Sequence, residues 1–180
     1  MCNQTCLDWG VKHLKPDLIK DKQILEVGSY NINGSLRKDI EIYQPKEYIG
    51  CDIAYGNDVD VICNASNLME KFGKKSYDLV ISCCALEHII DWKAAISNMK
   101  GVCKEDGYIF IIVPEKWSKH SFPHDYWRYN EKDLRYIFAD CKILVIEKKI
   151  EEIGILLCLL VQKSRFMEVN LTQYSIKEVL

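Results

Sequence analysis

The chain has 180 residues and a mass of 21.0 kDa, enough for one domain with a substantial buried core. Its 24 basic and 26 acidic residues leave a net charge of −2, so the overall charge disfavours a nucleic-acid partner, although a local basic patch stays compatible with it. The first ten residues lack the apolar stretch of a secretory signal, and the longest apolar run, residues 153–161, is too short to cross a bilayer. We therefore expect a cytoplasmic protein of one domain, residues 1–180, with no membrane span.

Nine cysteines are a high and odd count. Their spacing contains no C-x-x-C pair, and several, such as Cys51 and Cys158, lie in or beside apolar runs where a thiol acts as a small hydrophobic side chain. A cytoplasmic location favours free thiols over a disulfide framework. Without paired ligand spacing, no zinc or other metal site is predicted.

Residues 1–22 carry apolar side chains at roughly helical spacing, interrupted by Pro16, which starts a new turn or helix. The spacing predicts a helical segment packed on the edge of a sheet. Residues 23–27 follow as a short apolar run of strand length rather than helix length.

A glycine turn comes directly after this first strand. Gly28 permits a backbone turn, or a close ligand approach, that a Cβ would block. Asn33 and Ser35 are both suitable N-caps, so a helix is predicted from near Ser35 to about Tyr43. In open α/β sheets, a strand, a glycine turn and a helix N-terminus form a cofactor crevice at the carboxyl ends of the strands.

The turn lacks the G-x-G-x-x-G fingerprint of dinucleotide sites, because the next glycine after Gly28 is Gly34. Glu26 would repel a pyrophosphate and attract a cationic ligand, and S-adenosylmethionine carries a sulfonium and an ammonium but no phosphate. The string L-E-V-G-S-Y-N-I-N-G-S resembles the first motif of the class I S-adenosylmethionine-dependent methyltransferases. On that resemblance, Glu26 and Gly28 are expected to hold the methionine part of the cofactor, with Ser29 and Tyr30 beside them.

The second predicted strand, residues 48–52, ends in an acid. Asp52 lies 24 residues beyond Gly28, about the separation expected of a carboxylate that binds ribose hydroxyls. The alternative is an aspartate that caps the following loop. We favour the ribose contact and place Asp52 and the adjacent Ile53 in the cofactor site.

A third strand is predicted over residues 59–63, and Asn67 with Glu70 forms a pattern typical of a capping box at the start of a short helix. In the resembled family the turn after this strand runs along the adenine, where an Asp commonly meets the exocyclic amine. This chain has Asn64 there, whose amide oxygen can accept the same hydrogen bond. The resemblance thus assigns three residues to the adenine: Asn64, Ala65 and Ser66.

The fourth strand, residues 77–82, continues into a second stretch that resembles the family. The string Y-D-L-V-I-S-C-C-A-L-E-H-I is similar to the fourth methyltransferase motif and its sequel, whose backbone faces the methionine part of the cofactor. The resemblance places Cys83 and Cys84 at the cofactor, and Glu87 and His88 in the turn that follows. His88 is either a border of the active site or a structural histidine.

Asp91 is predicted to cap a helix over residues 92–100, with Gly101 at its end, and residues 108–113 form a further apolar strand that ends at Pro114. Strands alternate with helical segments across residues 23–113. This alternation predicts an α/β fold with a parallel, doubly wound, Rossmann-like sheet.

Residues 114–130 show neither helical nor strand periodicity, and structureless connections of this length in compact domains are usually functional. The stretch contains five large aromatic side chains: Trp117, Phe122, Tyr126, Trp127 and Tyr129. One interpretation is a loop held to the body by these aromatic anchors. The other is a substrate loop, whose assigned contacts are Trp117, Asp125, Tyr126 and Arg128.

Three histidines are candidates for a general base, in the order His124, His88 and His120. The string P-H-D-Y-W-R-Y also resembles a segment of some bacterial methyltransferases linked to surface-polysaccharide biosynthesis. It extends the expected acceptor from a small molecule to one of saccharide type.

A helix is predicted from Asn130 to about Phe138, followed by strands at residues 141–149 and 153–163. In the resembled fold the last two of seven strands form an antiparallel edge hairpin, in the order 3-2-1-4-5-7-6, and N-terminal segments such as residues 1–22 often act as lids. Residues 164–180 have no counterpart there and are expected to form an extra helix or a homodimer contact.

The resemblance covers residues 23–163 and implies methyl transfer from S-adenosylmethionine, with S-adenosylhomocysteine as the product. Two alternatives stay open. One is a non-catalytic module that keeps the fold and the cofactor, and the other is an NAD-dependent oxidoreductase, against which Glu26 and the missing second glycine argue.

Overall fold

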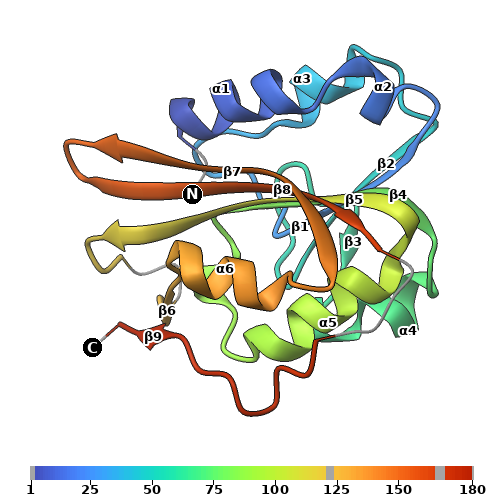
Figure 1. Ribbon diagram of the computed structural model, residues 1–180. Coiled ribbons are helices and arrows are strands. Elements are labelled where there is room, and N and C mark those ends of the chain that lie inside the picture. The colour runs from blue at the N-terminus through green and yellow to red at the C-terminus, as the bar shows by residue number, and fades with distance from the viewer. Residues whose placement is uncertain (1–2, 121–123, 165–168, 180) are drawn as a thin grey trace.

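The computed structural model describes residues 3–120, 124–164 and 169–179. Its centre is a seven-stranded sheet (Figure 1). In spatial order the strands are β3 (Val61–Ile62), β2 (Glu47–Asp52), β1 (Gln23–Val27), β4 (Tyr77–Cys83), β5 (Cys103–Trp117), β8 (Gly154–Lys163) and β7 (Cys141–Glu151). The first five run parallel, and β8 is antiparallel to both of its neighbours. Since β6 lies outside this sheet, the predicted strand order and edge hairpin are confirmed.

Helices cover both faces of the sheet (Figure 1). One face carries α1 (Gln4–His13), α2 (Pro16–Ile19) and α3 (Arg37–Glu41), and the other carries α4 (Leu68–Phe72), α5 (Trp92–Val102) and α6 (Glu131–Ile137). Along β5 the side chains alternate between two cores: Phe110 and Ile112 pack with the first group of helices, whereas Ile109 and Ile111 pack with the second. Because both faces are buried, the central strands are nearly continuous apolar runs, with a few polar residues such as Glu26 in β1.

Two helix ends differ from the prediction. Helix α3 begins at Arg37 rather than near Ser35, and the Ser35 hydroxyl accepts a hydrogen bond from the Arg37 amide (3.1 Å) without capping a longer helix. Asn67 makes no cap for α4. Instead, the side chain of Asn98 in α5 accepts from the Met69 amide (2.9 Å), a contact 29 residues away that local spacing does not reveal.

The sequence predicts that Gly101 ends the helix of residues 92–100. In the structure this helix is α5, and it continues to Val102. A Cβ on Gly101 would lie 2.2 Å from the sulfur of Met69. This glycine therefore permits close packing of α4 on α5 and does not terminate α5.

The segment expected to be a structureless loop is partly strand. β5 continues past Pro114 to Trp117, paired with β8, and β6 (Trp127–Arg128) pairs antiparallel with β9 (Lys177–Glu178) of the tail. The tail thus packs on its own chain, and its described residues contain the two-residue strand β9 and no helix, so the expected extra helix is absent from them. The predicted aromatic anchor Phe122 lies outside the described residues.

Two findings concern the residues that the structure describes. None of their helices is long and apolar enough to span a membrane. No disulfide joins the eight cysteines among them.

Candidate active site

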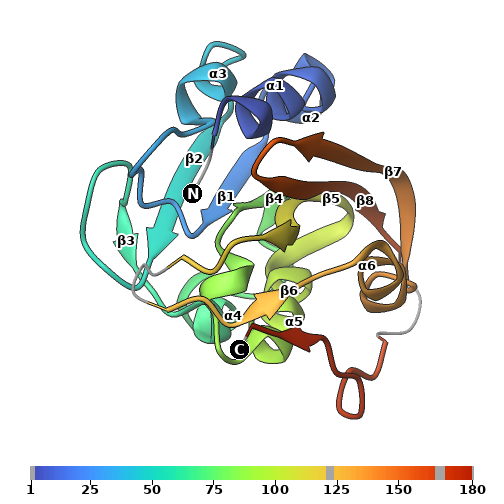
Figure 2. The ribbon, with the colours of Figure 1, turned by 90° about the vertical axis from the view of Figure 1, so that its left-hand side faces the viewer.

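A cavity of about 420 Å³ opens at the carboxyl ends of β1, β2, β3 and β4, where the arrowheads of β1, β2 and β3 end on one side of the molecule (Figure 2). All eleven residues that the sequence assigned to a cofactor line it: Glu26, Gly28, Ser29, Tyr30, Asp52, Ile53, Asn64, Ala65, Ser66, Cys83 and Cys84. His88, His124 and Tyr126 line it as well. The topology therefore brings four separate predicted segments to one place.

Gly28 makes the turn at the end of β1 with a φ of +79°, a conformation that side-chain-bearing residues rarely adopt. Its amide and that of Ser29 both donate to the carbonyl of Cys51 (2.9 and 3.1 Å), which ties the turn to the end of β2. A Cβ on Gly28 would lie 2.2 Å from the Cβ of Ala85. Glycine is thus required both by the backbone angle and by the close approach of the chain after β4.

Glu26 is a nearly buried carboxyl group in the cavity wall, 5% exposed. The Tyr48 hydroxyl donates a hydrogen bond to it (2.7 Å). Burial raises the pKa of Glu26 to about 7, an effect that the hydrogen bond from Tyr48 only partly offsets. A cationic ligand group beside Glu26 would favour its ionised form.

This raised pKa predicts how stability depends on pH. The protonated form of Glu26 is favoured in the folded state, so its contribution is complete below pH 4.5 and is lost as the pH rises through about 7. Glu26→Gln, which stays neutral, should therefore be more stable than the wild type above pH 7, by up to about 3 kcal/mol, and nearly equal to it at pH 4. Urea unfolding of both proteins at pH 4, 6 and 8 measures this. A constant difference across the three pH values would contradict it.

Asp52 at the end of β2 accepts hydrogen bonds from the backbone amides of Tyr30 (3.3 Å) and Ala54 (3.1 Å). The loop-capping role left open by the sequence is therefore present. Each carboxylate oxygen keeps a further lone pair, so capping leaves room for contact with a ligand.

Asn64 at the end of β3 likewise has a local partner. Its side-chain oxygen accepts from the Ser66 amide (2.9 Å) and caps the short 3-10 helix η1 (Ala65–Asn67). Its side-chain NH2 can only donate, so an amine donor of a ligand would have to share the capped oxygen or use a backbone carbonyl.

Cys84 follows β4 with a φ of +50°, and its sulfur lies 3.7 Å from that of Cys6 in α1. The hydrogen bond with Cys6, together with burial, holds the pKa of the Cys84 thiol well above its ordinary value. The thiol therefore stays protonated at neutral pH and contributes shape to the cavity wall rather than a nucleophile.

The three candidate bases lie in different places. His88 and His124 line the cavity, and the Nδ1 of His88 contacts the backbone carbonyl of His124. His120 does not line it. Its backbone amide donates to Asp125 (2.9 Å), and its ring nitrogen Nδ1 lies 3.1 Å from the same carboxylate oxygen.

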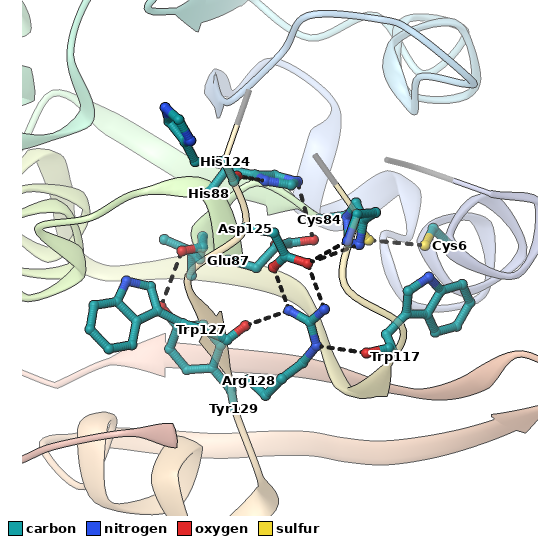
Figure 3. A network of polar contacts seen from close by, with 12 residues as sticks. Cys6, Cys84, Glu87, His88, Trp117, His124, Asp125, Trp127, Arg128 and Tyr129 are labelled. Atoms are coloured by element: carbon teal, nitrogen blue, oxygen red, sulfur yellow. Dashed lines mark hydrogen bonds and ion pairs between the residues drawn. The ribbon is translucent and has the colours of Figure 1, made fainter. Parts of the chain in front are cut away.

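Asp125 and Arg128, both 5% exposed, form a bidentate ion pair with distances of 2.5 and 2.6 Å (Figure 3). The remaining N–H groups of Arg128 donate to the carbonyls of Trp117, Ser118 and Trp127 (3.2, 3.2 and 2.9 Å). All five donors of the guanidinium are therefore used within the chain. Burial alone would raise the pKa of Asp125, but hydrogen bonds from Arg128 and from the His120 amide outweigh it and lower that pKa.

The four predicted substrate contacts lie in different places. Of the four predicted contacts only Tyr126 lines the cavity, whereas Asp125, Arg128 and Trp117 do not. Asp125 and Arg128 instead hold the segment before β6 against the end of β5. The i,i+3 spacing of an acid and an arginine is the sequence signal that could have indicated an internal pair.

The sequence also missed several residues of the cavity wall. They are Val27, Ile32, Gly34, Cys51, Ala54, Cys63, Ala85, Ile89, Ile90 and Asp91. All adjoin predicted segments in the chain, so extending each segment by a few residues would have found most of them.

Comparison with known proteins gives the family. The family model described as a methyltransferase domain matches residues 6–139, whereas no curated protein matches the sequence. A Burkholderia thailandensis 1,6-didemethyltoxoflavin-N1-methyltransferase, crystallised with that substrate and S-adenosylhomocysteine, is 14% identical with a TM-score of 0.68, over 88% of this chain and 78% of that chain. The magnesium protoporphyrin IX methyltransferase of Synechocystis PCC 6803, with bound S-adenosylmethionine, is 19% identical with a TM-score of 0.66, over 89% and 79%.

A third similar structure is a Methanosarcina mazei S-adenosylmethionine-dependent methyltransferase, 15% identical with a TM-score of 0.64, over 81% of this chain and 93% of that chain. At these identities the structural neighbours show a shared fold. The family model covers most of the sequence, including the segments that form the cavity. The chain belongs to the methyltransferase domain family, and its fold is that of the class I S-adenosylmethionine-dependent methyltransferases.

Proposed function

We propose that the protein binds S-adenosylmethionine in this cavity and transfers its methyl group to a small-molecule acceptor. The observation that carries the proposal is the convergence of the eleven predicted cofactor residues on one cavity of about 420 Å³. A volume of this order is typical of small-molecule and cofactor sites.

The residues present fit this cofactor in three respects. The turn at Gly28 is a cradle that a Cβ would fill, so the backbone can approach a ligand closely. Glu26 supplies a carboxyl group whose ionisation an ammonium or sulfonium would favour. The buried hydroxyl of Ser29 has no hydrogen-bond partner among the described residues, and Ser29 belongs to the wall of the cavity.

We assign the methionine part of the cofactor to Glu26 and Gly28, the ribose to Asp52 and the adenine to residues 64–66. Cys83 and Cys84 form the wall beside the methionine part. Ile53 and Ile90 line the cavity and are largely exposed, so they offer an apolar rim to the adenine or the acceptor.

When bound, the cofactor supplies the electrophilic methyl group. The chain's own work is to orient the acceptor, exclude water and, for a hydroxyl acceptor, remove a proton. His124 is the first candidate for the proton because it lines the cavity, and the contact between His88 Nδ1 and the His124 carbonyl fixes the backbone that carries it. His120 is the last candidate, because it lies outside the cavity wall.

Two separate arguments bear on the class of the methyl acceptor. The didemethyltoxoflavin and protoporphyrin substrates named for two structural neighbours support a small organic molecule. The saccharide-type alternative rests on the resemblance of residues 123–129, of which Asp125 and Arg128 are occupied with each other.

Asp52→Ala should weaken binding of S-adenosylmethionine by about 1–3 kcal/mol, because it removes the hydrogen-bond acceptor of the ribose hydroxyls. Calorimetric titration measures the change. Asp17→Ala, at an exposed aspartate of α2 away from the cavity, is the matched control and should bind as the wild type does. Affinity within twofold of wild type for Asp52→Ala would contradict the ribose assignment.

Methyl transfer itself is tested by incubating the protein with S-adenosylmethionine and single candidate acceptors, from hydroxylated aromatics to sugars, and measuring S-adenosylhomocysteine. We expect product formation that depends on the acceptor and falls in His124→Ala. Cofactor binding without turnover on any acceptor class would favour the non-catalytic alternative.

A further inference from the structure

Glu87, His88 and His120 come together beside the cavity, although the sequence separates them into two segments. Glu87 and His88 belong to the 3-10 helix η2 (Leu86–His88) after β4, and His120 lies in the segment after β5. One potential ligand atom from each lies within 4.8 Å of the others. The rings of His88 and His120 meet edge to face, with centroids 5.0 Å apart.

Glu87 is the most deeply buried member, at 1% exposure. Its Oε2 has no hydrogen-bond partner among the described residues, and its Oε1 lies 3.9 Å from Nε2 of His88 (Figure 3). A buried carboxylate oxygen without a partner is costly, and such groups normally pair with a donor or coordinate a metal. This oxygen indicates that the cluster has a partner beyond the protein atoms around it.

The hydrogen bonds of the two rings leave a lone pair available on each. Nδ1 of His88 contacts the carbonyl oxygen of His124, which can only accept, so this nitrogen carries the proton. Nδ1 of His120 lies 3.1 Å from the Asp125 carboxylate and 3.2 Å from the Ser118 carbonyl, which are also acceptors. In the neutral rings, Nε2 is then the lone-pair nitrogen.

This pattern is the usual surrounding of metal-binding histidines, which donate their second N–H to a carboxylate or a backbone carbonyl. Asp125 is itself fixed by its ion pair with Arg128. The ion pair therefore supports His120 from outside the cluster.

We propose that Glu87, His88 and His120 bind one divalent transition-metal ion, with zinc as the best match. Two imidazoles and one carboxylate form a ligand set that zinc accepts, and three protein ligands leave a position open for water or another oxygen or nitrogen donor. Zinc–ligand distances of about 2.0–2.2 Å place tetrahedral ligand atoms about 3.3 Å apart, so the side chains must close by up to roughly 1.5 Å.

The ion would tie the segment before β6 to the turn after β4. His88 also lines the cavity, so the ion would lie behind the cavity wall. Spacing did not predict this site because its ligands lie 32 residues apart and meet only through the fold. Metal binding at this site does not depend on methyl transfer and is measurable without cofactor or acceptor.

Titration of the purified protein with cobalt(II) alone, followed by absorption spectroscopy, tests the proposal. We expect one equivalent to bind with the weak visible bands of nitrogen and oxygen ligation. His120→Gln and Glu87→Gln should each weaken binding at least about tenfold, which is the lower end of losses seen on altering even outer ligand partners. His13→Gln is the matched control, because His13 lies in α1 beside Glu147, outside the cluster, and should leave binding unchanged.

Zinc alone should raise the midpoint of thermal unfolding of the wild type but not that of His120→Gln. The side chain of His120 is 19% exposed, so His120→Gln should fold. It therefore tests the metal site even if Glu87→Gln fails to fold. Three outcomes would overturn the proposal. They are an intense sulfur-to-cobalt absorption band, which would indicate cysteine ligands, cobalt binding by His120→Gln as tight as that of the wild type, and no cobalt binding by the wild type.

Discussion

Gly28→Ala is expected to lower the free energy of unfolding by about 2–5 kcal/mol and to abolish measurable binding of S-adenosylmethionine. The φ of +79° costs a residue with a Cβ about 1–2 kcal/mol. The new methyl group would lie 2.2 Å from the Cβ of Ala85, and overpacking of this kind typically costs about 1–3 kcal/mol. Relief of the clash requires the turn after β1 to move away from the chain after β4, which changes the cavity between them.

Gly73→Ala is the matched control. Gly73 has almost the same φ, +82°, but its Cβ would approach only the Ser76 hydroxyl, at 3.2 Å, and it lies outside the cavity wall. The backbone of Gly73 (φ +82°, ψ 162°) lies in a region that is almost exclusive to glycine, so Gly73→Ala should destabilise the protein by about 1–3 kcal/mol through this conformation alone and should bind the cofactor as the wild type does. Urea unfolding and calorimetry measure both quantities. If Gly28→Ala bound the cofactor with wild-type affinity, the assignment of the Gly28 turn to the cofactor site would be wrong.

Asp125→Ala is expected to destabilise the protein by about 3–5 kcal/mol, because it leaves the buried guanidinium of Arg128 without its carboxylate. Glu131→Ala, which breaks the exposed pair with Arg135 on α6, is the matched control and should cost less than about 1 kcal/mol. Urea unfolding at neutral pH compares the two variants. If Asp125 instead served as a substrate contact, its variant would fold with wild-type stability and lose only turnover.

Because the pKa of Asp125 is lowered, the destabilisation by Asp125→Ala should depend on pH. Its contribution to stability is complete above the ordinary aspartate pKa of 3.8 and is lost as the pH falls through the lowered folded value. The difference in stability between wild type and Asp125→Ala should therefore shrink as the protein is acidified below pH 4. A difference that stays constant on acidification would show that the ion pair does not account for the loss.

The predictable parts of this structure are those that a local pattern determines. The central strands are buried on both faces, so each is a nearly continuous apolar run that the sequence displays directly. Because the carboxyl ends of parallel strands lie at one edge of the sheet, residues at or directly after these ends, such as Asp52 and Gly28, could be assigned to one cavity without coordinates.

The parts of the structure that the sequence did not reveal depend on contacts between distant segments. Asn98 replaces Asn67 as the cap of α4, and β6 pairs with β9 across about fifty residues of chain. Asp125 and Arg128 look like ligand-binding side chains in a sequence, since polar groups in a long loop usually face solvent or substrate. Only the folded chain shows that every N–H of Arg128 already has an acceptor.

The central claim is that the cavity binds S-adenosylmethionine. Calorimetric titration of the purified protein with S-adenosylmethionine, S-adenosylhomocysteine and NADH tests it most directly. We expect micromolar binding of the first two ligands and none of NADH, since the turn has no second glycine and the ionised form of Glu26 repels a pyrophosphate. Binding of NADH alone, or of none of the three, would contradict the account.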